Sequence, residues 1–176
     1  RVEDDDVGIY WLDIELKAAT NLLELDQFLR DIWLECCGHL SAFEINREQY
    51  PIPYEGYKEI SDNSMDMKAS KMLAPGLVFH HEYDFGSTTA LELKVVSERR
   101  GSFDGPLRLL SRNKPYEWHC CKCDAPASCI NTEEMFETEN PFYCDKHAEK
   151  HEHRDYAFLP VANSPRMGVC GYTGER

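Results

Sequence analysis

The sequence predicts an α+β fold, a mostly antiparallel sheet packed on helices, with a small C-terminal zinc-knuckle module. Residues 10–16 alternate apolar and polar side chains, which is typical of a strand with one buried face. Residues 22–37 instead carry apolar side chains at helical spacing. Cysteine and histidine then recur in two short pairs, at residues 120–123 and 144–147, with the spacing of a zinc-binding module.

The longest predicted helix follows the first strand. Thr20 or Asn21 can cap its first turn, and Gly38 stands where a residue in the left-handed conformation would end it. Because the helical spacing continues to the end of this segment, we expect Cys36 and Cys37 to belong to the core face of the helix, and a redox or metal role is the alternative.

Further strands and one short helix are expected around it. We expect residues 1–6 to be frayed, strands over residues 41–46, 106–113 and 156–161, a short helix over residues 64–73 capped by Ser64, and a hairpin of residues 77–85 and 88–99. Gly86 lies between the arms of the hairpin, where glycine supplies the positive φ of a tight turn.

Residues 47–63 are rich in tyrosine and proline and have no periodicity, so they predict a long loop. Loops of this length in a compact domain are often functional or mobile. Tyr50, Tyr54 and Tyr57 could line a binding groove there, and the alternative is that these tyrosines simply cover the core.

The length of 176 residues leaves room for an α+β domain over residues 7–115 and a metal module over residues 116–174. Arg1 is not a usual first residue, so we expect further chain before it. No apolar run approaches the roughly 18 residues of a membrane span, and no signal-peptide pattern opens the sequence. The cysteines cluster in C-x2-C form, which favours reduced thiols and metal in the cytoplasm over a secreted disulfide framework.

The formal net charge of −13 is unevenly distributed. Residues 1–60 carry 14 acidic and 5 basic side chains, residues 61–115 carry 7 and 8, and residues 116–176 carry 11 and 6. Binding to nucleic acid generally needs a basic surface that displaces counterions, so the charge argues against it. An acidic surface could meet a basic protein partner, although solubility alone is the commoner cause of acidity.

Cys120, Cys123, Cys144 and His147 are the predicted ligands of a structural Zn²⁺. A two-residue gap lets a tight turn aim two side chains at one cation, and two such turns supply the tetrahedral set that zinc prefers. Four protein ligands leave no open position, which favours a structural ion over a catalytic one. Cys121 is expected to point away from the ion.

A second zinc ion is an alternative that the sequence leaves open. Its candidate ligands are Cys129, His151, His153 and Cys170, with Cys129 paired to the two histidines in an interleaved arrangement.

Three separated stretches resemble one protein family. They are LDQFLRDIWLECCGHLSAFEI, HEYDFGSTTALELKVV and, towards the end of the chain, CCKCDAPASC…YCDKH…LPVANSPRMGVCGYTG. Together they are similar to the plasmid pRiA4b ORF-3-like family, and more closely to its branch with a C-terminal zinc-binding module. The most specific parts are YDFG at residues 83–86 and NSPRMG at residues 163–168.

The resemblance spans about residues 10–174 and implies an α+β fold with a mostly antiparallel sheet. It implies little about activity, because the family is largely uncharacterised and occurs in mobile-element and hypothetical proteins. This chain departs from the family at two points. Ser87 and Thr88 stand where the family often has Asp-Trp, and Thr132 stands where a second cysteine pair would place the partner of Cys129.

We therefore expect a zinc-stabilised binding or adaptor protein that recognises another protein, with its oligomeric state left open. The candidate binding surface consists of Tyr50, Tyr54, Tyr57, Tyr83, Asp84 and Arg166. One alternative is a nucleic-acid-associated zinc module of a mobile-element protein. Another is a metal-assisted hydrolase, although the sequence offers no nucleophile paired with a base and no phosphate-binding loop.

Overall fold

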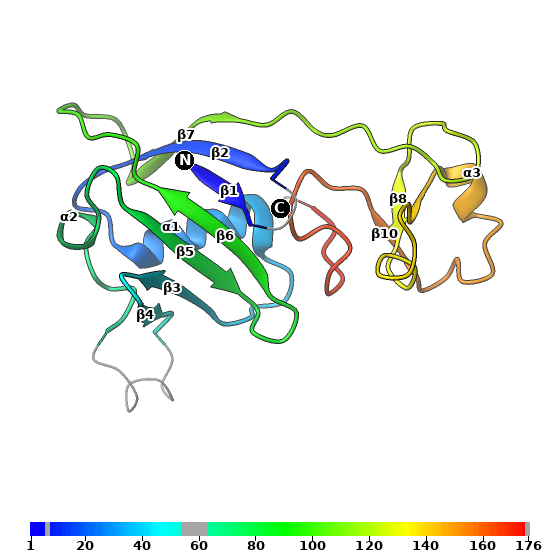
Figure 1. The fold of residues 1–176 in the computed structure, drawn as a ribbon, viewed down its shortest axis with the longest axis horizontal. Helices are drawn as coiled ribbons and strands as arrows, with labels where there is room; N and C mark the ends of the chain where they lie inside the picture. The colour runs from blue at the N-terminus through cyan, green and yellow to red at the C-terminus, as the bar shows by residue number, and fades with distance from the viewer. Residues whose placement is uncertain (6–7, 54–62, 175–176) are drawn as a thin grey trace. The chain divides into compact units, whose positions relative to one another are not determined.

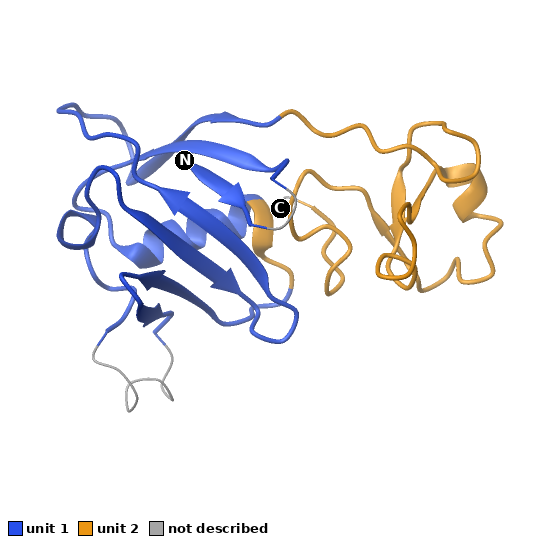
Figure 2. Cartoon of the chain, in the orientation of Figure 1, with its two compact units in different colours: residues 1–32, 37–113 blue, residues 33–36, 114–176 orange. Residues whose placement is uncertain are grey.

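The computed structural model describes residues 1–5, 8–53 and 63–174. The chain forms two compact units (Figure 2). The first contains residues 1–32 and 37–113, and the second contains residues 33–36 and 114–176. Among the described residues, no helix has the length and apolar character needed to cross a bilayer.

The first unit is built on an antiparallel seven-stranded sheet in the order β4-β3-β5-β6-β1-β2-β7, with α1 lying against one face (Figure 1). Its strands are β1 (Val2–Asp4), β2 (Trp11–Leu16), β3 (Ser41–Ile45), β4 (Glu48–Pro51), β5 (Val78–Tyr83), β6 (Thr89–Lys94) and β7 (Leu107–Arg112). The predicted α+β class with a mostly antiparallel sheet is therefore present.

Two of these strands were not predicted. β1 lies where a frayed lead-in was expected, and it pairs with both β2 and β6, which buries the side chains of Val2 and Asp4. β4 lies inside the predicted long loop and pairs with β3, so that Phe43 stands opposite Tyr50. Both strands are short, and their pairing partners rather than their own patterns hold them in the sheet.

The hairpin of β5 and β6 follows the predicted alternation, with Phe79 opposite Leu93 and all its inward side chains buried. The positive φ at its turn, however, belongs to Asp84 (φ 64°) and not to Gly86, so the prediction for Gly86 was wrong. The Asp84 carboxylate makes this conformation favourable, because Oδ1 accepts a hydrogen bond of 3.1 Å from the backbone N–H of Gly86.

Helix α1 (Leu22–Leu29) begins with a capping box. Asn21 Oδ1 accepts from the N–H of Glu24 at 2.8 Å, and the Glu24 carboxylate accepts from the N–H of Asn21 at 3.0 Å. The helix continues as a π-helical turn, η1 (Arg30–Leu34), and then ends. Cys36 and Cys37 consequently lie beyond the helix and not in its core face, which corrects the prediction, while Gly38 has the expected left-handed conformation (φ 79°).

The predicted helix over residues 64–73 is reduced to one turn, α2 (Ala69–Met72), which is preceded by Lys68. Ser64 does not cap it. The Ser64 hydroxyl instead accepts a hydrogen bond from the N–H of Asp66, which forms a local turn.

A buried charged cluster joins α1 to the sheet. Asp26 accepts hydrogen bonds from Arg30 Nε at 2.6 Å and from His81 Nε2 at 2.7 Å, and all three side chains are at most 5% exposed. Arg30 also donates to the hydroxyl of Ser41. Burial opposes ionisation of Asp26, but the hydrogen bond and charge of His81 and the charge of Arg30 outweigh it and lower the pKa of the carboxyl.

The second unit contains a three-stranded antiparallel sheet in the order β10-β8-β9. Its elements are β8 (Cys129–Asn131), β9 (Phe142–Tyr143), α3 (Asp145–Ala148) and β10 (Phe158–Pro160), the last lying within the predicted strand at residues 156–161. Ile130, Phe142 and Tyr143 form its small apolar core, and the ring of Trp118 stacks on Phe142 with 4.1 Å between centroids.

Candidate metal centre

The first ligand pair lies in a tight turn of the second unit. The backbone N–H groups of Cys123 and Asp124 both donate to the carbonyl of Cys120, which folds the chain back within one turn. Asp124 takes a left-handed conformation (φ 57°) to complete it. The N–H of Lys122 points at the Cys120 sulfur at 3.5 Å, so the turn presents both sulfurs and an N–H group on one side.

The second pair comes from the end of β9 and from α3. Cys144 precedes α3 and makes no side-chain capping bond with it, which leaves its sulfur directed elsewhere. The N–H groups of His147 and Ala148 both donate to the carbonyl of Cys144, and this places the His147 ring one helical turn from the Cys144 sulfur.

The four predicted ligands converge on one point. Their ligand atoms all lie within 4.8 Å of one another. His147 Nδ1 is 3.5 Å from Cys120 Sγ and 3.4 Å from Cys144 Sγ, while the sulfurs of Cys123 and Cys144 are 3.8 Å apart.

These separations match the edges of a zinc tetrahedron. Bonds of about 2.3 Å to sulfur and about 2.0–2.1 Å to nitrogen, at tetrahedral angles, put two sulfurs roughly 3.8 Å apart and sulfur and nitrogen roughly 3.5 Å apart. Hydrogen bonding alone would not require all of these distances at once. The donor set, three thiols and one imidazole, also suits zinc better than the hard cations that prefer oxygen.

The electrostatics of the site favour an ionised sulfur at Cys120. Burial opposes ionisation, but the backbone N–H groups of Cys144 and Lys122 and the ring of His147 outweigh it and lower the pKa of Cys120 to about 6. At Cys123, the N–H of Ala125 favours the thiolate, but burial and the neighbouring sulfurs prevail and raise the pKa. A divalent cation between the sulfurs would remove that repulsion.

Cys121, the fifth sulfur in this region, lies outside the ligand group. Its backbone N–H donates to the carbonyl of Phe142, and its side chain interacts with the hydroxyl of Tyr143. The hydroxyl of Tyr143 in turn contacts Glu134 Oε2 at 2.7 Å. The register Cys120 and Cys123 is therefore the one that the fold brings together with Cys144.

The residues predicted for a second ion are dispersed. Cys129 Sγ donates to the carbonyl of Tyr143, and His151 contacts Glu134 at 3.1 Å. His153 Nδ1 is 2.7 Å from a carboxylate oxygen of Glu133. Among the described residues, these three and Cys170 do not form one ligand group.

Cys37 and His39, both in the first unit, form a contact of 2.9 Å between Sγ and Nε2. Cys170 belongs to the second unit.

The predicted binding surface is not a surface in the structure. Tyr83 and Arg166 are completely buried, and Tyr50 and Asp84 are only 5% and 6% exposed. The hydroxyl of Tyr50 donates to the carboxylate of its neighbour Glu48, and the ring covers the core, as the alternative interpretation expected. Tyr54 and Tyr57 lie outside the described residues.

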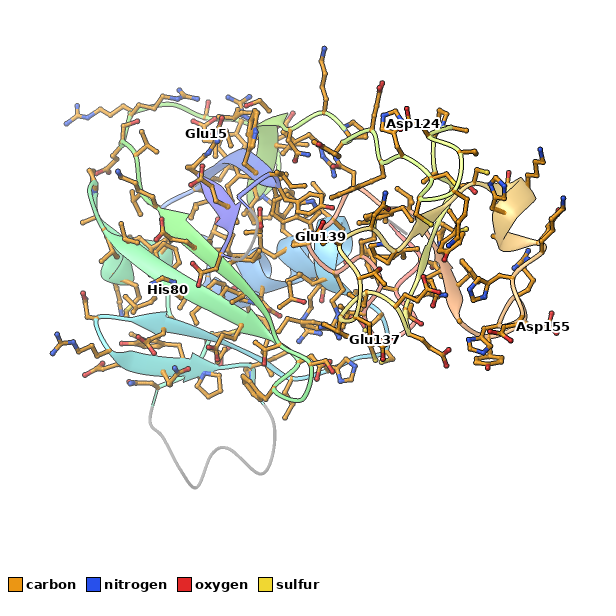
Figure 3. All side chains as sticks on the ribbon, turned by 45° about the vertical axis from the view of Figure 1, so that its right-hand side comes forward. Glu15, His80, Asp124, Glu137, Glu139 and Asp155 are labelled. Carbon is orange, nitrogen blue, oxygen red and sulfur yellow. The ribbon has the colours of Figure 1, made fainter. Side chains whose placement is uncertain are left out.

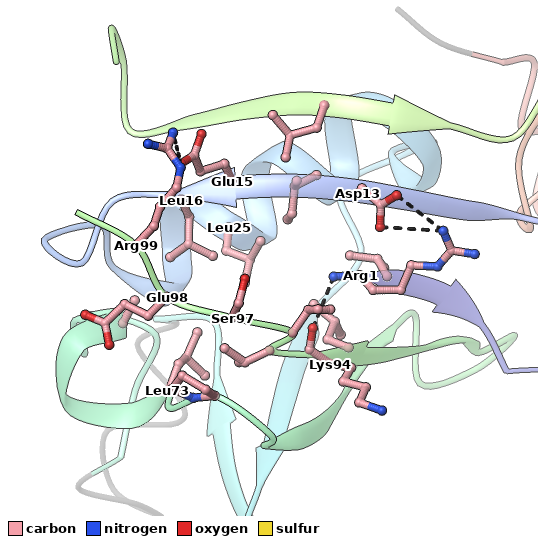
Figure 4. Close-up of a pocket in the computed structure, with 18 of the residues that line it drawn as sticks. Arg1, Asp13, Glu15, Leu16, Leu25, Leu73, Lys94, Ser97, Glu98 and Arg99 are labelled. Atoms are coloured by element: carbon pink, nitrogen blue, oxygen red, sulfur yellow. Dashed lines mark hydrogen bonds and ion pairs between the residues drawn. The ribbon is translucent and has the colours of Figure 1, made fainter. Parts of the chain in front are cut away.

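The first unit has a cavity of about 700 Å³ between β2, the chain after β6, and the helical layer (Figure 4). Leu25, Leu73 and Leu93 contribute to its apolar lining. Two ion pairs lie among its lining residues, those of Arg1 with Asp13 and of Arg108 with Glu15. None of the predicted site residues that the structure describes lines this cavity.

No protein-family model, no curated protein and no solved structure matches this chain.

Proposed function

We propose that the chain binds one Zn²⁺ at Cys120, Cys123, Cys144 and His147, and that this ion has a structural role. The distances among the three sulfurs and the imidazole nitrogen carry the proposal, because they agree with the edges of a zinc tetrahedron. All four positions of a tetrahedral ion would be taken by protein atoms. Water or substrate would then have no place on the metal, which disfavours metal-assisted hydrolysis.

Zinc content tests this part of the proposal. The purified chain should contain zinc that resists dialysis, and Cys123→Ser should lower the zinc content by one ion per chain. Cys121→Ser is the matched control, because it removes a sulfur from the same turn without removing a ligand. Equal zinc in both variants would overturn the assignment. An X-ray absorption spectrum with an oxygen ligand in place of a fourth protein atom would favour the hydrolase.

We further propose that the zinc module belongs to a protein-binding adaptor. Phe136 is 86% exposed. Glu137 and Glu139 follow it in the sequence, and both are exposed side chains of the second unit (Figure 3). An aromatic side chain with an acidic rim suits a basic, partly apolar protein surface. Nucleic acid is disfavoured, because the second unit carries more acidic than basic side chains.

The adaptor proposal is tested by affinity capture from the native host. A specific partner should be retained by the wild-type chain, be released by salt, and be lost with Phe136→Ala. The matched control is Tyr156→Ala, which truncates another exposed aromatic side chain of the same unit. If mixed DNA or RNA shifted in a gel at low salt and no protein were captured, the adaptor function would be refuted in favour of nucleic-acid binding. Membership of the plasmid pRiA4b ORF-3-like family is part of the proposal.

A further inference from the structure

The cavity of the first unit lies beside the central strands of the seven-stranded sheet. β1 joins β2 to β6 through Val2, which stands between Leu12 and Leu93. Farther along, residues 14–16 of β2 and residues 95–99 after β6 line two sides of the cavity (Figure 4). Its volume of about 700 Å³ lies within the range of roughly 300–1,000 Å³ that is usual for small-molecule sites.

The floor of the cavity is apolar. Leu25 of α1, Phe79 of β5 and Leu93 of β6 line it, and each of these side chains is at most 3% exposed. Side chains in a protein interior are normally packed on all sides, and a hollow beside them forfeits dispersion contacts. The apolar body of a ligand would restore these contacts. A fully polar ligand would instead lose its hydration without gaining hydrogen-bond partners at the floor.

The rim of the cavity carries a surplus of positive charge. Among the described residues that line it, four side chains are basic and three are acidic. Two of the basic side chains, Arg99 and Arg108, share the single carboxylate of Glu15, with Arg108 Nη2 at 2.6 Å from Oε2 and Arg99 on Oε1. The side chains of Arg99 and Arg108 are 55% and 45% exposed, so a second anion can reach them from solvent.

We propose that this cavity binds a small amphipathic anion, an organic carboxylate with an apolar body. The apolar body would pack against the floor formed by Leu25, Phe79 and Leu93. The carboxylate would accept hydrogen bonds from the guanidinium groups of Arg99 and Arg108, whose planar N–H donors match the geometry of a carboxylate. A cation of the same size would meet the surplus of like charge at the rim, and a neutral molecule would leave that surplus unused.

This site is separate from the proposed zinc site and from the proposed adaptor surface around Phe136. All residues that line the cavity belong to the first unit, whereas the four proposed zinc ligands and Phe136 belong to the second. Measurements of zinc content and of captured proteins therefore leave the proposal for the cavity untouched, and the reverse also holds.

Calorimetric titration of the whole chain with octanoate tests the site. Octanol, which has the same apolar chain without the charge, and acetate, which has the carboxylate without the chain, are the matched probes. Octanoate should bind about tenfold more tightly than octanol, because the rim adds charge-assisted hydrogen bonds to the apolar contacts. Acetate should show no saturable binding.

Three outcomes of this titration would overturn the proposal. The first is that octanoate does not bind, and the second is that octanoate and octanol bind with equal affinity. The third is that an uncharged apolar tetrapeptide binds more tightly than octanoate, which would assign the cavity to an extended peptide.

Two variants and a control locate the bound molecule. Leu73→Trp enlarges a wall of the cavity and should abolish the binding of both octanoate and octanol. Arg99→Gln should weaken octanoate about fivefold and leave octanol unchanged, and because octanol reports an intact cavity, this loss cannot come from unfolding. Arg100→Gln is the matched control, since Arg100 is exposed and does not line the cavity. If Arg100→Gln weakened octanoate as much as Arg99→Gln, the effect would belong to general surface charge and the site would be refuted.

Discussion

Substitution of Cys123 by serine is expected to unfold residues 116–161 and to leave the seven-stranded sheet folded. The substitution removes one of the four proposed zinc ligands, and zinc affinity falls steeply when a tetrahedral thiolate set is incomplete.

The size of the effect follows from how little else holds the module. Its large buried apolar side chains are Ile130, Phe142 and Tyr143, and at about 1.5–3 kcal/mol each they contribute roughly 5–9 kcal/mol. Structural zinc contributes on the order of 10–16 kcal/mol in zinc-finger peptides near neutral pH. An ordinary domain has a free energy of unfolding of only about 5–15 kcal/mol in total. Loss of the ion would therefore remove about as much free energy as keeps such a domain folded.

Amide hydrogen exchange followed by mass spectrometry measures the result. Peptides covering β8, β9 and β10 should lose protection in Cys123→Ser, while peptides covering β5 and β6 keep it. Cys129→Ser, in β8 but outside the ligand group, should exchange like wild type. Full protection of β8 and β9 in a Cys123→Ser sample shown to lack this zinc would refute the reasoning.

Two further predictions concern the fold that carries the site. Asp26→Asn leaves the buried charge of Arg30 without its carboxylate and should destabilise the first unit by about 3–5 kcal/mol in urea denaturation, while exposed Asp31→Asn should change stability by at most about 0.5 kcal/mol. The pKa of Asp26 is lowered in the folded state, so this stabilisation is complete above about pH 4 and is lost as the pH falls through the pKa of the folded state. The difference in unfolding free energy between wild type and Asp26→Asn should therefore shrink on acidification, and a difference that grew would contradict the prediction. Asn21→Ala removes the capping box of α1 and should cost about 1 kcal/mol, seen as a lower Tm, and an unchanged Tm would show that the cap is dispensable.

The sequence predicted the elements that show a clear pattern of apolar and polar side chains within their own residues. Alternation over β5 and β6 arises because one face of each strand is buried, and such a pattern is local. β2 shows the same sequence pattern, although only Leu12 among its side chains is buried. β1 and β4 have three and four residues, which is too few for a pattern. They form strands because they pair with neighbouring strands of the sheet. Pairing over long sequence separations cannot be read from a short segment alone.

The end of α1 shows how a small irregularity misleads a periodic pattern. A regular helix would have continued the apolar face through Ile32 and Cys36. In the π-helical turn the spacing widens, so Trp33 and Leu34 are both completely buried while Ile32 is only partly buried. The helix ends two residues before Cys36, and Cys37 is exposed instead of packed in the core.

The candidate metal centre could be predicted from the sequence because each half of its ligand set is formed within a single turn, at residues 120–123 and 144–147, so that spacing alone reveals it. The residues predicted for a second ion have no such spacing. In the structure the sulfur of Cys129 donates to the carbonyl of Tyr143 and the ring of His151 contacts Glu134, so these side chains are directed to other partners. Such partners come from other strands and turns, and a pattern within one short segment cannot reveal them.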